Sequence, residues 1–266
     1  MHPFFTLFGK QLPAYWVCAL AGAAASAVLL LLRHKRFSDL QQVDITNGAA
    51  LAVVGLIIGG RVLYLLTILP AIISSWSYVT ENHLFWDLIS NGMVFYGGLF
   101  GAIAALAIYL RKYKLDTKPY FDYIVPAIPL FHAFGRVGCF LTGCCHGIVS
   151  EKYGIVFTDS ISSENGIPYL PVQLLGATLE ILLFIAVLFY EKHHHRQGKS
   201  LYFYLGSYAA GRFFVEFLRG DVARGIWFGL STSQWISVAV LVVLAVRAIR
   251  ERRALKSPDA RAASDT

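Results

Sequence analysis

Residues 132–147 read HAFGRVGCFLTGCCHG, and the interpretation of the whole chain starts from this segment. It is apolar enough to enter a membrane, yet it holds an arginine, two histidines, three cysteines and four glycines. A charge at the centre of a bilayer costs from about 2.5 to more than 10 kcal/mol. A sequence that keeps Arg136 there needs a compensating partner or a bound ligand.

The composition predicts a polytopic membrane protein. The chain has 266 residues, of which 56% are hydrophobic and 15% are charged, and its mean hydropathy is +0.57. Several apolar runs approach 20 residues, the length that crosses a hydrocarbon core of roughly 30 Å. We predict an all-α fold with about seven transmembrane helices, at 12–32, 48–69, 92–110, 121–141, 170–190, 199–218 and 232–249.

The basic residues predict an orientation. Of the 23 Lys and Arg residues, 16 lie in alternate gaps and in the tail, and four lie in the other gaps. This bias follows the positive-inside rule for an N-terminus outside and a C-terminus inside. The net charge of +7 is therefore a topology signal, and nucleic-acid binding is not expected. The remaining three basic residues, Arg61, Arg136 and Arg212, fall within predicted spans, in the expected outer half of the membrane.

A single integral-membrane domain is expected over residues 1–250. Two of its outer connections are long. Residues 70–91 are rich in aromatic side chains and predict an amphipathic arm at the interface, and residues 142–169 predict a small extramembrane cap with one or two short strands. Residues 251–266 are polar and basic, and predict a disordered tail.

Polar residues recur at the depth of Arg136. Arg212, Glu216 and Arg219 are spaced by four and three residues, which puts them on one helical face. An intrahelical ion pair explains Arg212 with Glu216, but it does not explain the arginines of other spans. His132 lies one turn before Arg136, on roughly the same face. Further candidates at similar depth are Tyr15, Tyr96 and Gln173.

Glycines flank several of these positions, among them Gly97, Gly98 and Gly138. Small residues let membrane helices approach closely, and the space they leave also suits a lipid headgroup. The two interpretations stay open.

The three clustered cysteines also admit alternatives. Apolar packing or a structural disulfide is one, and a soft-metal site formed by Cys139, Cys144, Cys145 and His146 is another. A catalytic thiol that carries a lipid group transiently is the third. No metal and no cofactor is included in the expected site.

Four motifs in order carry a resemblance to the prolipoprotein diacylglyceryl transferase family. Residues 59–64 (GGRVLY) resemble its GGR-x-x-Y stretch, and residues 92–101 (GMVFYGGLFG) resemble its GGMSFHGGLIG motif. Residues 135–143 (GRVGCFLTG) are similar to GRxGNFxNxE, and residues 211–221 (GRFFVEFLRGD) are similar to RFxxEFxRxPD. Weaker matches are Tyr15, Pro171-Val-Gln173 and Ser233-Gln234.

The resemblance implies an enzyme of the bacterial plasma membrane, the inner membrane, with its active site toward the outer half. Its substrates would be phosphatidylglycerol, within the membrane lipids, and the signal peptides of prolipoproteins. A diacylglyceryl group would pass to the lipobox cysteine thiol, forming a thioether and releasing glycerol phosphate. The alternatives are a paralogue with another acceptor and a non-catalytic lipid-binding membrane protein.

The resemblance also assigns roles to residues. Arg136 and Arg212 match the family's essential arginines and are expected to bind the phosphate, and Glu216 orients Arg212. The other expected catalytic residues are Tyr96 and His132, and the expected substrate-binding residues are Tyr15, Arg61, Gly97, Gly98, Gly138, Cys139, Gln173 and Arg219.

Several residues depart from the family pattern, and they include Leu175-Gly176, which stand in place of the Tyr-Glu that follows its P-[ST]-Q stretch. Tyr96 stands where the family has histidine, and Cys139 and Cys144 replace its asparagine and glutamate. A phenol with a pKa of about 10 is a poor base at neutral pH. His132 and His146 are the imidazoles left to take the thiol proton.

Overall fold

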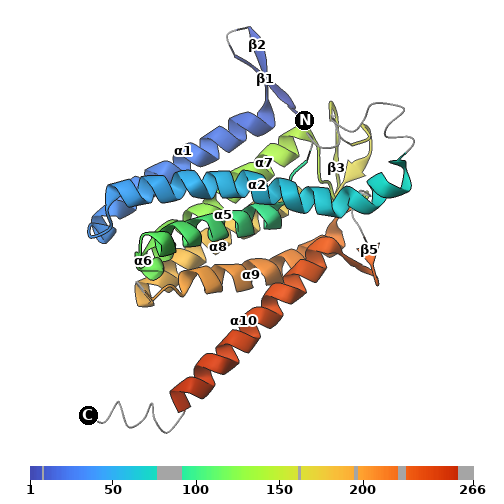
Figure 1. Ribbon diagram of the computed structural model, residues 1–266. Helices are drawn as coiled ribbons and strands as arrows, with labels where there is room; N and C mark the ends of the chain where they lie inside the picture. Colours follow the sequence, from blue (N-terminus) through green and yellow to red (C-terminus); the bar gives the residue numbers. More distant parts are fainter. Residues whose placement is uncertain (8, 77–91, 161–162, 195–196, 221–225, 257–266) are drawn as a thin grey trace, which may run out of the picture. The chain divides into compact units, whose positions relative to one another are not determined.

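The computed structural model (Figure 1) describes residues 1–7, 9–76, 92–160, 163–194, 197–220 and 226–256. Contacts between helices divide the chain into two compact units. One unit comprises residues 1–32 and 124–266, and the other comprises residues 33–123. Each unit is described by itself.

Helices occur where the apolar runs predicted them. They are α1 (Ala14–His34), α2 (Gln42–Ser74), α5 (Phe95–Lys112), α6 (Thr117–Ile124), α7 (Ala127–Thr142), α8 (Val172–His193), α9 (Ser200–Val215) and α10 (Thr232–Lys256). Two 3₁₀ turns extend this set, η1 at Lys35–Phe37 and η2 at Glu216–Leu218. The expected all-α membrane class is confirmed, since five helical segments among the described residues are long and apolar enough to cross a membrane.

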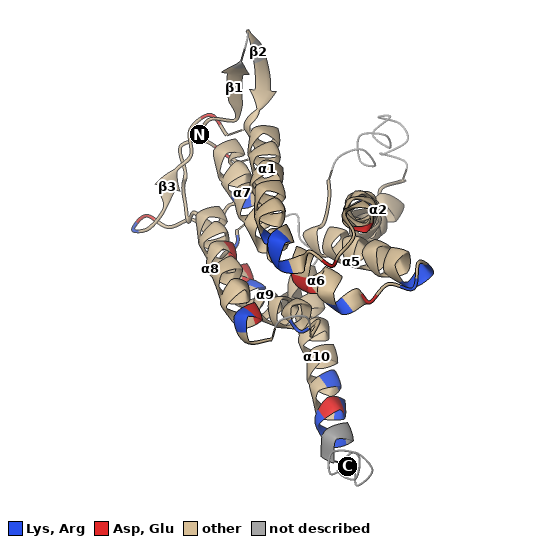
Figure 2. Cartoon of the chain, turned by 90° about the vertical axis from the view of Figure 1, so that its left-hand side faces the viewer, with Lys and Arg blue, Asp and Glu red and all other residues tan. Residues whose placement is uncertain are grey.

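The distribution of charge along individual helices fits a membrane protein. In α1 the first charged residue is Arg33, in its last turn, and in α10 it is Arg247 (Figure 2). Between the start of each helix and that arginine the chain offers only uncharged side chains to a bilayer.

The predicted span 121–141 is interrupted. Helix α6 ends at Ile124 and α7 begins at Ala127, with Pro126 between them. Proline cannot donate a backbone hydrogen bond, and it disfavours the helical conformation of the residue before it. The amide of Ile128 instead donates to the carbonyl of Val125 at 3.1 Å, which forms a turn.

In the unit of residues 33–123, glycines bring α2 and α5 into backbone contact. A Cβ on Gly59 would meet the carbonyl oxygen of Gly97 and lie 2.9 Å from the Cα of Gly101. Gly55 faces the carbonyl of Gly101 in the same way. Helix packing therefore accounts for these small residues.

In the unit of residues 1–32 and 124–266, α8 packs between α7 and α9, and α10 packs against α9 (Figure 1). Helix α1 approaches α7 at two glycines. A Cβ on Gly22 would lie 2.8 Å from Cβ of Phe134, and one on Gly138 would lie 3.2 Å from Cα of Tyr15. These contacts set the position of the segment 132–147.

Three short antiparallel hairpins complete this unit. Strands β3 (Ile155–Val156) and β4 (Pro168–Tyr169) pair within the predicted cap. The other two pairs were not predicted from the sequence. They are β1 (Phe4–Leu7) with β2 (Lys10–Pro13), and β5 (Ile226–Trp227) with β6 (Leu230–Ser231).

Two expectations about the connections need comment. Most of the predicted interfacial arm, residues 77–91, lies outside the described residues, and its first residues continue α2 to Ser74. Helix α10 continues to Lys256 and so includes the first residues of the predicted disordered tail, 251–266. Residues 247–256 contain no Gly or Pro, and Arg247 pairs with Glu251 one turn later at 2.8 Å. Residues 257–266 lie outside the described residues.

The contact between α2 and α5 gives a stability prediction. Gly59→Ala should lower the free energy of unfolding by about 1–3 kcal/mol, because the new methyl group meets backbone that cannot rotate away. Gly206→Ala is the matched control, since its Cβ would only touch Cδ1 of Leu244 at 3.4 Å. Chemical denaturation in detergent measures both, and equal stability of the two variants would contradict this packing.

Candidate active site

A pocket lies among α7, α8 and α9. Its charged lining comprises Arg136, Arg212, Arg219 and Glu180, and its other lining includes Tyr208 and Gly176. Sequence reasoning had assigned these three arginines, together with Arg61, to one site. The structure brings Arg136, Arg212 and Arg219 together, from two helices and the turn that follows α9.

Glu216 joins two of these arginines. The Nη2 atom of Arg212 lies 2.6 Å from Oε2 of Glu216, and Nη1 of Arg219 lies 3.8 Å from the same oxygen. All three side chains are at most 9% exposed. The spacing of four and three residues predicted this arrangement, and the prediction of an ion pair between Arg212 and Glu216 is confirmed.

Arg136 differs from the other two arginines. In the described part of the chain its guanidinium forms no ion pair within 4.0 Å. Its side chain runs across the surface of α8 at Gly176, where an added Cβ would lie 3.4 Å from Cδ of Arg136 and 3.6 Å from Nε. Gly176 thus leaves the space that the arginine occupies, and the guanidinium is available to a ligand.

His132 contacts a carboxylate that sequence reasoning missed. Nδ1 of His132 lies 2.7 Å from Oε1 of Glu180, and the two side chains are 8% and 2% exposed. The contact is an ion pair when the imidazole is protonated and a hydrogen bond when it is neutral. The signal that could have found Glu180 is a carboxylate inside the apolar run 170–190, seven residues after Gln173.

Tyr208 was missed as well. It lies one turn before Arg212 on α9, is 2% exposed and lines the pocket. Its ring centroid is 5.6 Å from that of His132. The spacing of four residues before Arg212 places it on the arginine face, which is the signal that could have identified it.

The charges of the pocket do not balance among the described residues. Three guanidiniums and the carboxylate of Glu180 line it, Glu180 contacts His132, and Glu216 pairs with Arg212 and Arg219 beside it. Arg136 and Arg212 are close enough for their charges to repel each other. Because unscreened like charges in a low-dielectric site are costly, the arrangement favours a bound anion.

The thiol loop, residues 139–147, is tied to this pocket through its backbone. The side-chain amide of Gln173 donates from Nε2 to the carbonyl of Cys144 at 2.7 Å. Two backbone hydrogen bonds join the loop to its neighbours, Gly147 N–H to Leu170 at 2.9 Å and Gly220 N–H to His146 at 3.1 Å. The next residue, Ile148, donates its N–H to Leu218 at 3.0 Å. The loop is therefore fixed beside Arg219.

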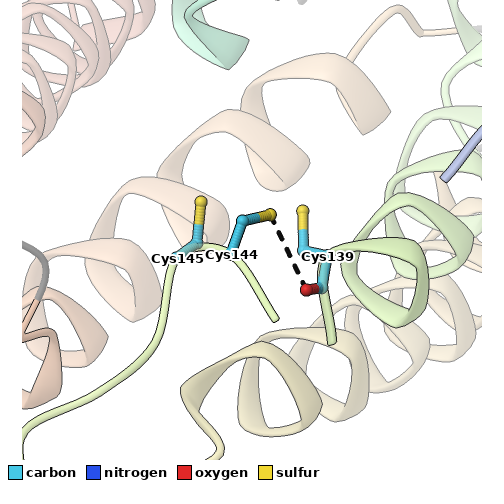
Figure 3. Close-up of side chains that lie close together, drawn as sticks. All are labelled: Cys139, Cys144 and Cys145. Carbon is cyan, nitrogen blue, oxygen red and sulfur yellow. Dashed lines mark hydrogen bonds between the residues drawn. The ribbon is translucent and has the colours of Figure 1, made fainter. Parts of the chain in front are cut away.

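Two left-handed residues return the thiol loop toward α7. Gly143 has φ +76°, and Cys145 has φ +56°, which is uncommon for a residue with a side chain. Holding a non-glycine residue there costs about 1–3 kcal/mol. The result is that Cys139, Cys144 and Cys145 lie side by side (Figure 3), and all are free thiols.

Neighbouring thiols and arginines act on the pKa of Cys145. Hydrogen bonds from the thiols of Cys139 and Cys144 lower the pKa of Cys145 well below its usual range, against the effect of burial. The positive charges of Arg219 and Arg136 act in the same direction. The phenol of Tyr15 also lies within electrostatic range of the three thiols and of Arg136.

Four of the predicted site residues belong to the other unit. Arg61 donates from Nη1 to the carbonyl of Gly92 at 3.2 Å. Tyr96 is 2% exposed and its ring stacks on that of Phe100, with the centroids 5.8 Å apart. Gly97 and Gly98 pack against α2, where their nearest neighbours are Gly59 and Leu56. A binding role for these residues stays a prediction.

Known proteins resemble this chain over most of its length. A family model described as prolipoprotein diacylglyceryl transferase matches residues 3–250. A relative from Clostridium tetani named phosphatidylglycerol–prolipoprotein diacylglyceryl transferase is 32% identical over 240 residues, which are 90% of this chain and 93% of that protein. A relative from Clostridium perfringens with the same name and the number 2 is 32% identical over 238 residues, 89% and 90% of the two chains. One from Bordetella parapertussis is 35% identical over 196 residues, 72% and 71% of the chains.

The contact of His132 with Glu180 gives a second stability prediction. Glu180→Ala should lower the free energy of unfolding by about 3–5 kcal/mol, because it removes a buried carboxylate that lies 2.7 Å from a buried imidazole. Glu251→Ala is the matched control. It removes a contact of 2.8 Å to Arg247 in which the side chains are 45% and 55% exposed, and should cost less than about 1 kcal/mol. Equal losses in chemical denaturation would show that the buried contact contributes no more than the exposed one.

Proposed function

Because this chain belongs to the prolipoprotein diacylglyceryl transferase family, we propose that the pocket of Arg136, Arg212 and Arg219 binds the phosphate of phosphatidylglycerol. The chain is a transferase that moves a diacylglyceryl group from phosphatidylglycerol to the cysteine thiol of a prolipoprotein. The family match favours this activity over a lipid-binding protein without catalysis. The observation that carries the proposal is a set of three guanidiniums whose charge exceeds that of the neighbouring carboxylates.

The chemistry of the leaving group explains the need for arginine. When the thiol sulfur attacks the glyceryl carbon, the bond from that carbon to the phosphate oxygen breaks, and glycerol phosphate leaves with an additional negative charge. Arg136 offers a planar fork of N–H donors that matches two phosphate oxygens. Fixed donors aimed at developing charge in a water-poor site stabilise the transition state more than the ground state.

The other two arginines have supporting parts in this proposal. Glu216 holds the guanidinium of Arg212 at 2.6 Å and so fixes its orientation toward the pocket. Arg219 shares the same carboxylate more loosely, at 3.8 Å, and lies at the turn after α9. We assign Arg212 to the phosphate and Arg219 to the entrance, where the acceptor arrives.

The thiol proton requires an acceptor, and the pair of Glu180 and His132 is our assignment. Glu180 lines the pocket next to Arg136, and it contacts His132 at 2.7 Å. The carboxylate can take the proton at the pocket and share it with the imidazole behind it. His132 is then a positioning residue that acts through Glu180.

We further propose seven spans, with the N-terminus outside and the C-terminus inside, in the bacterial inner membrane. The basic last turns of α1, α5 and α8 and the basic end of α10 support this orientation. It places the arginine pocket in the outer half of the membrane. The lipobox cysteine of a prolipoprotein, at the end of its signal peptide, would reach that side.

The arginines give the first functional prediction. Arg136→Ala and Arg212→Ala should each lower transfer by at least about 100-fold, since each removes a donor to the leaving phosphate. Arg250→Ala, an exposed arginine near the end of α10, is the control and should keep full activity. The assay uses liposomes with phosphatidylglycerol labelled in its acyl chains and a lipobox peptide. It follows the gain of one diacylglyceryl unit in the mass of the peptide.

A peptide with serine in place of the lipobox cysteine should gain no mass in that assay. If Arg136→Ala or Arg212→Ala transfers lipid at the wild-type rate with normal expression, the phosphate is bound elsewhere. If the wild-type protein transfers nothing under any condition, the assigned activity itself is wrong.

The residue that replaces the family's histidine gives another prediction. Tyr96→Phe should lower transfer by less than about tenfold, because a phenol is a poor base at neutral pH and its ring packing is kept. The same peptide assay measures it beside the arginine variants. Complete loss of transfer in a folded Tyr96→Phe protein would instead assign the phenol as acid, base or hydrogen-bond donor.

A further inference from the structure

Three thiols form a compact cluster that the proposed mechanism does not yet use. The Sγ atoms of Cys139, Cys144 and Cys145 all lie within 4.8 Å of one another (Figure 3). In a tetrahedral zinc site, Zn–S bonds of about 2.3 Å place the sulfurs roughly 3.8 Å apart. Small side-chain rotations would therefore bring the three sulfurs to the spacing of a zinc site.

The protein holds the cluster in place from several sides. The hydroxyl of Thr142 donates to Sγ of Cys144 at 3.4 Å, and that thiol lies 3.6 Å from the carbonyl of Cys139. Gln173, which is fully buried, fixes the carbonyl of Cys144 from α8. The positive φ of Cys145 turns its side chain to the same side as the other two. Apolar packing alone does not require three sulfurs to converge in this way.

We propose that these three thiolates bind a thiophilic divalent cation of the zinc class, and that its fourth position takes the acceptor thiol. This inference rests on the proposed function and replaces the expectation of a metal-free site. Among the described residues, no His, Asp or Glu ligand atom joins the three sulfurs within 4.8 Å. Three protein ligands and an open fourth position are the pattern of catalytic zinc sites.

The position of the cluster suits activation of a thiol. A thiol that coordinates zinc is deprotonated outright, which supplies the nucleophile where Tyr96 offers no base. Cys145 lies within electrostatic range of both Arg136 and Arg219. The nucleophile and the phosphate site are thus neighbours.

The proposed transfer is a displacement at the glyceryl carbon. The acceptor thiol binds the cation as thiolate, and its proton passes to the pair of Glu180 and His132 and then to water. The sulfur forms a C–S bond to the glyceryl carbon, while the C–O bond to phosphate breaks and its electron pair stays on glycerol phosphate. The product thioether is a weaker ligand than the thiolate and leaves the cation. No oxidation or reduction occurs.

The test begins with the metal content of the whole protein, purified in detergent under reducing conditions without chelators. Mass spectrometry of the metals should find about one zinc per chain. Replacement by Co²⁺ should give the sulfur-to-cobalt charge-transfer bands of a thiolate site. A lipobox peptide should change these bands, and the same peptide with serine for cysteine should not.

Serine variants test whether metal binding depends on the three clustered cysteines and not on the fourth cysteine, Cys18. Cys139→Ser, Cys144→Ser and Cys145→Ser should each weaken metal binding by about 10-fold or more. Cys18→Ser, on α1 and outside the cluster, is the matched control and should keep both the metal and its spectrum. Thermal unfolding checks that each variant is folded, and the spectra of the wild-type protein remain decisive if one is not.

Several results would overturn the inference. Reduced wild-type protein that binds no metal, or that holds a disulfide between two of the three cysteines, excludes the site. If metal is bound but its spectrum does not change when the cysteine peptide is added, the acceptor thiol does not take the fourth coordination position. Transfer at the wild-type rate by metal-free protein excludes the catalytic role and leaves the proposed function intact. Stoichiometric metal that responds to the peptide, without any lipid transfer, confirms the site and instead contradicts the proposed function.

Discussion

The fold of the α7–α9 region depends on placing three guanidiniums in one apolar bundle. Arg136, Arg212 and Arg219 share a pocket there with too little carboxylate to neutralise them. Placing these charges in an apolar bundle costs free energy, and two neighbours reduce the cost. Glu216 pairs with Arg212 and Arg219, and Gly176 has no side chain where that of Arg136 lies. The charge that remains is the part that an anionic phosphate can satisfy. Binding of the lipid donor would thus neutralise the positive charge that the carboxylates leave in the bundle.

Much of this could be predicted from the sequence because its signals are local. Apolar runs located the helices, and the spacing of Arg212, Glu216 and Arg219 predicted a shared face. The contact of His132 with Glu180 was not predicted, because the two residues lie on different helices, α7 and α8. A one-dimensional pattern does not fix which faces of two helices meet. The β5–β6 hairpin was missed because two-residue strands carry no period, and the strands of the β1–β2 hairpin are only four residues long.

Several residues of the chain depart from the family pattern, but the arginines of the pocket do not. The donor side keeps its arginines and Glu216, while cysteines occupy the positions of the family's asparagine and glutamate. The structure shows that these cysteines converge, and that backbone hydrogen bonds anchor their loop near Arg219. A metal that activates the thiol would explain both the loss of the histidine and the gain of the sulfurs.

Binding of the donor to Arg136 tests the central claim most directly. Isothermal titration with a short-chain phosphatidylglycerol would compare the wild-type protein with Arg136→Gln and with the exposed control Arg250→Gln. Loss of a charged hydrogen bond worth about 1.5–3 kcal/mol predicts an affinity lower by about 10- to 100-fold in Arg136→Gln and unchanged in the control. Equal affinities in all three proteins would contradict the account, because the phosphate would then be bound without the arginine that the pocket leaves free.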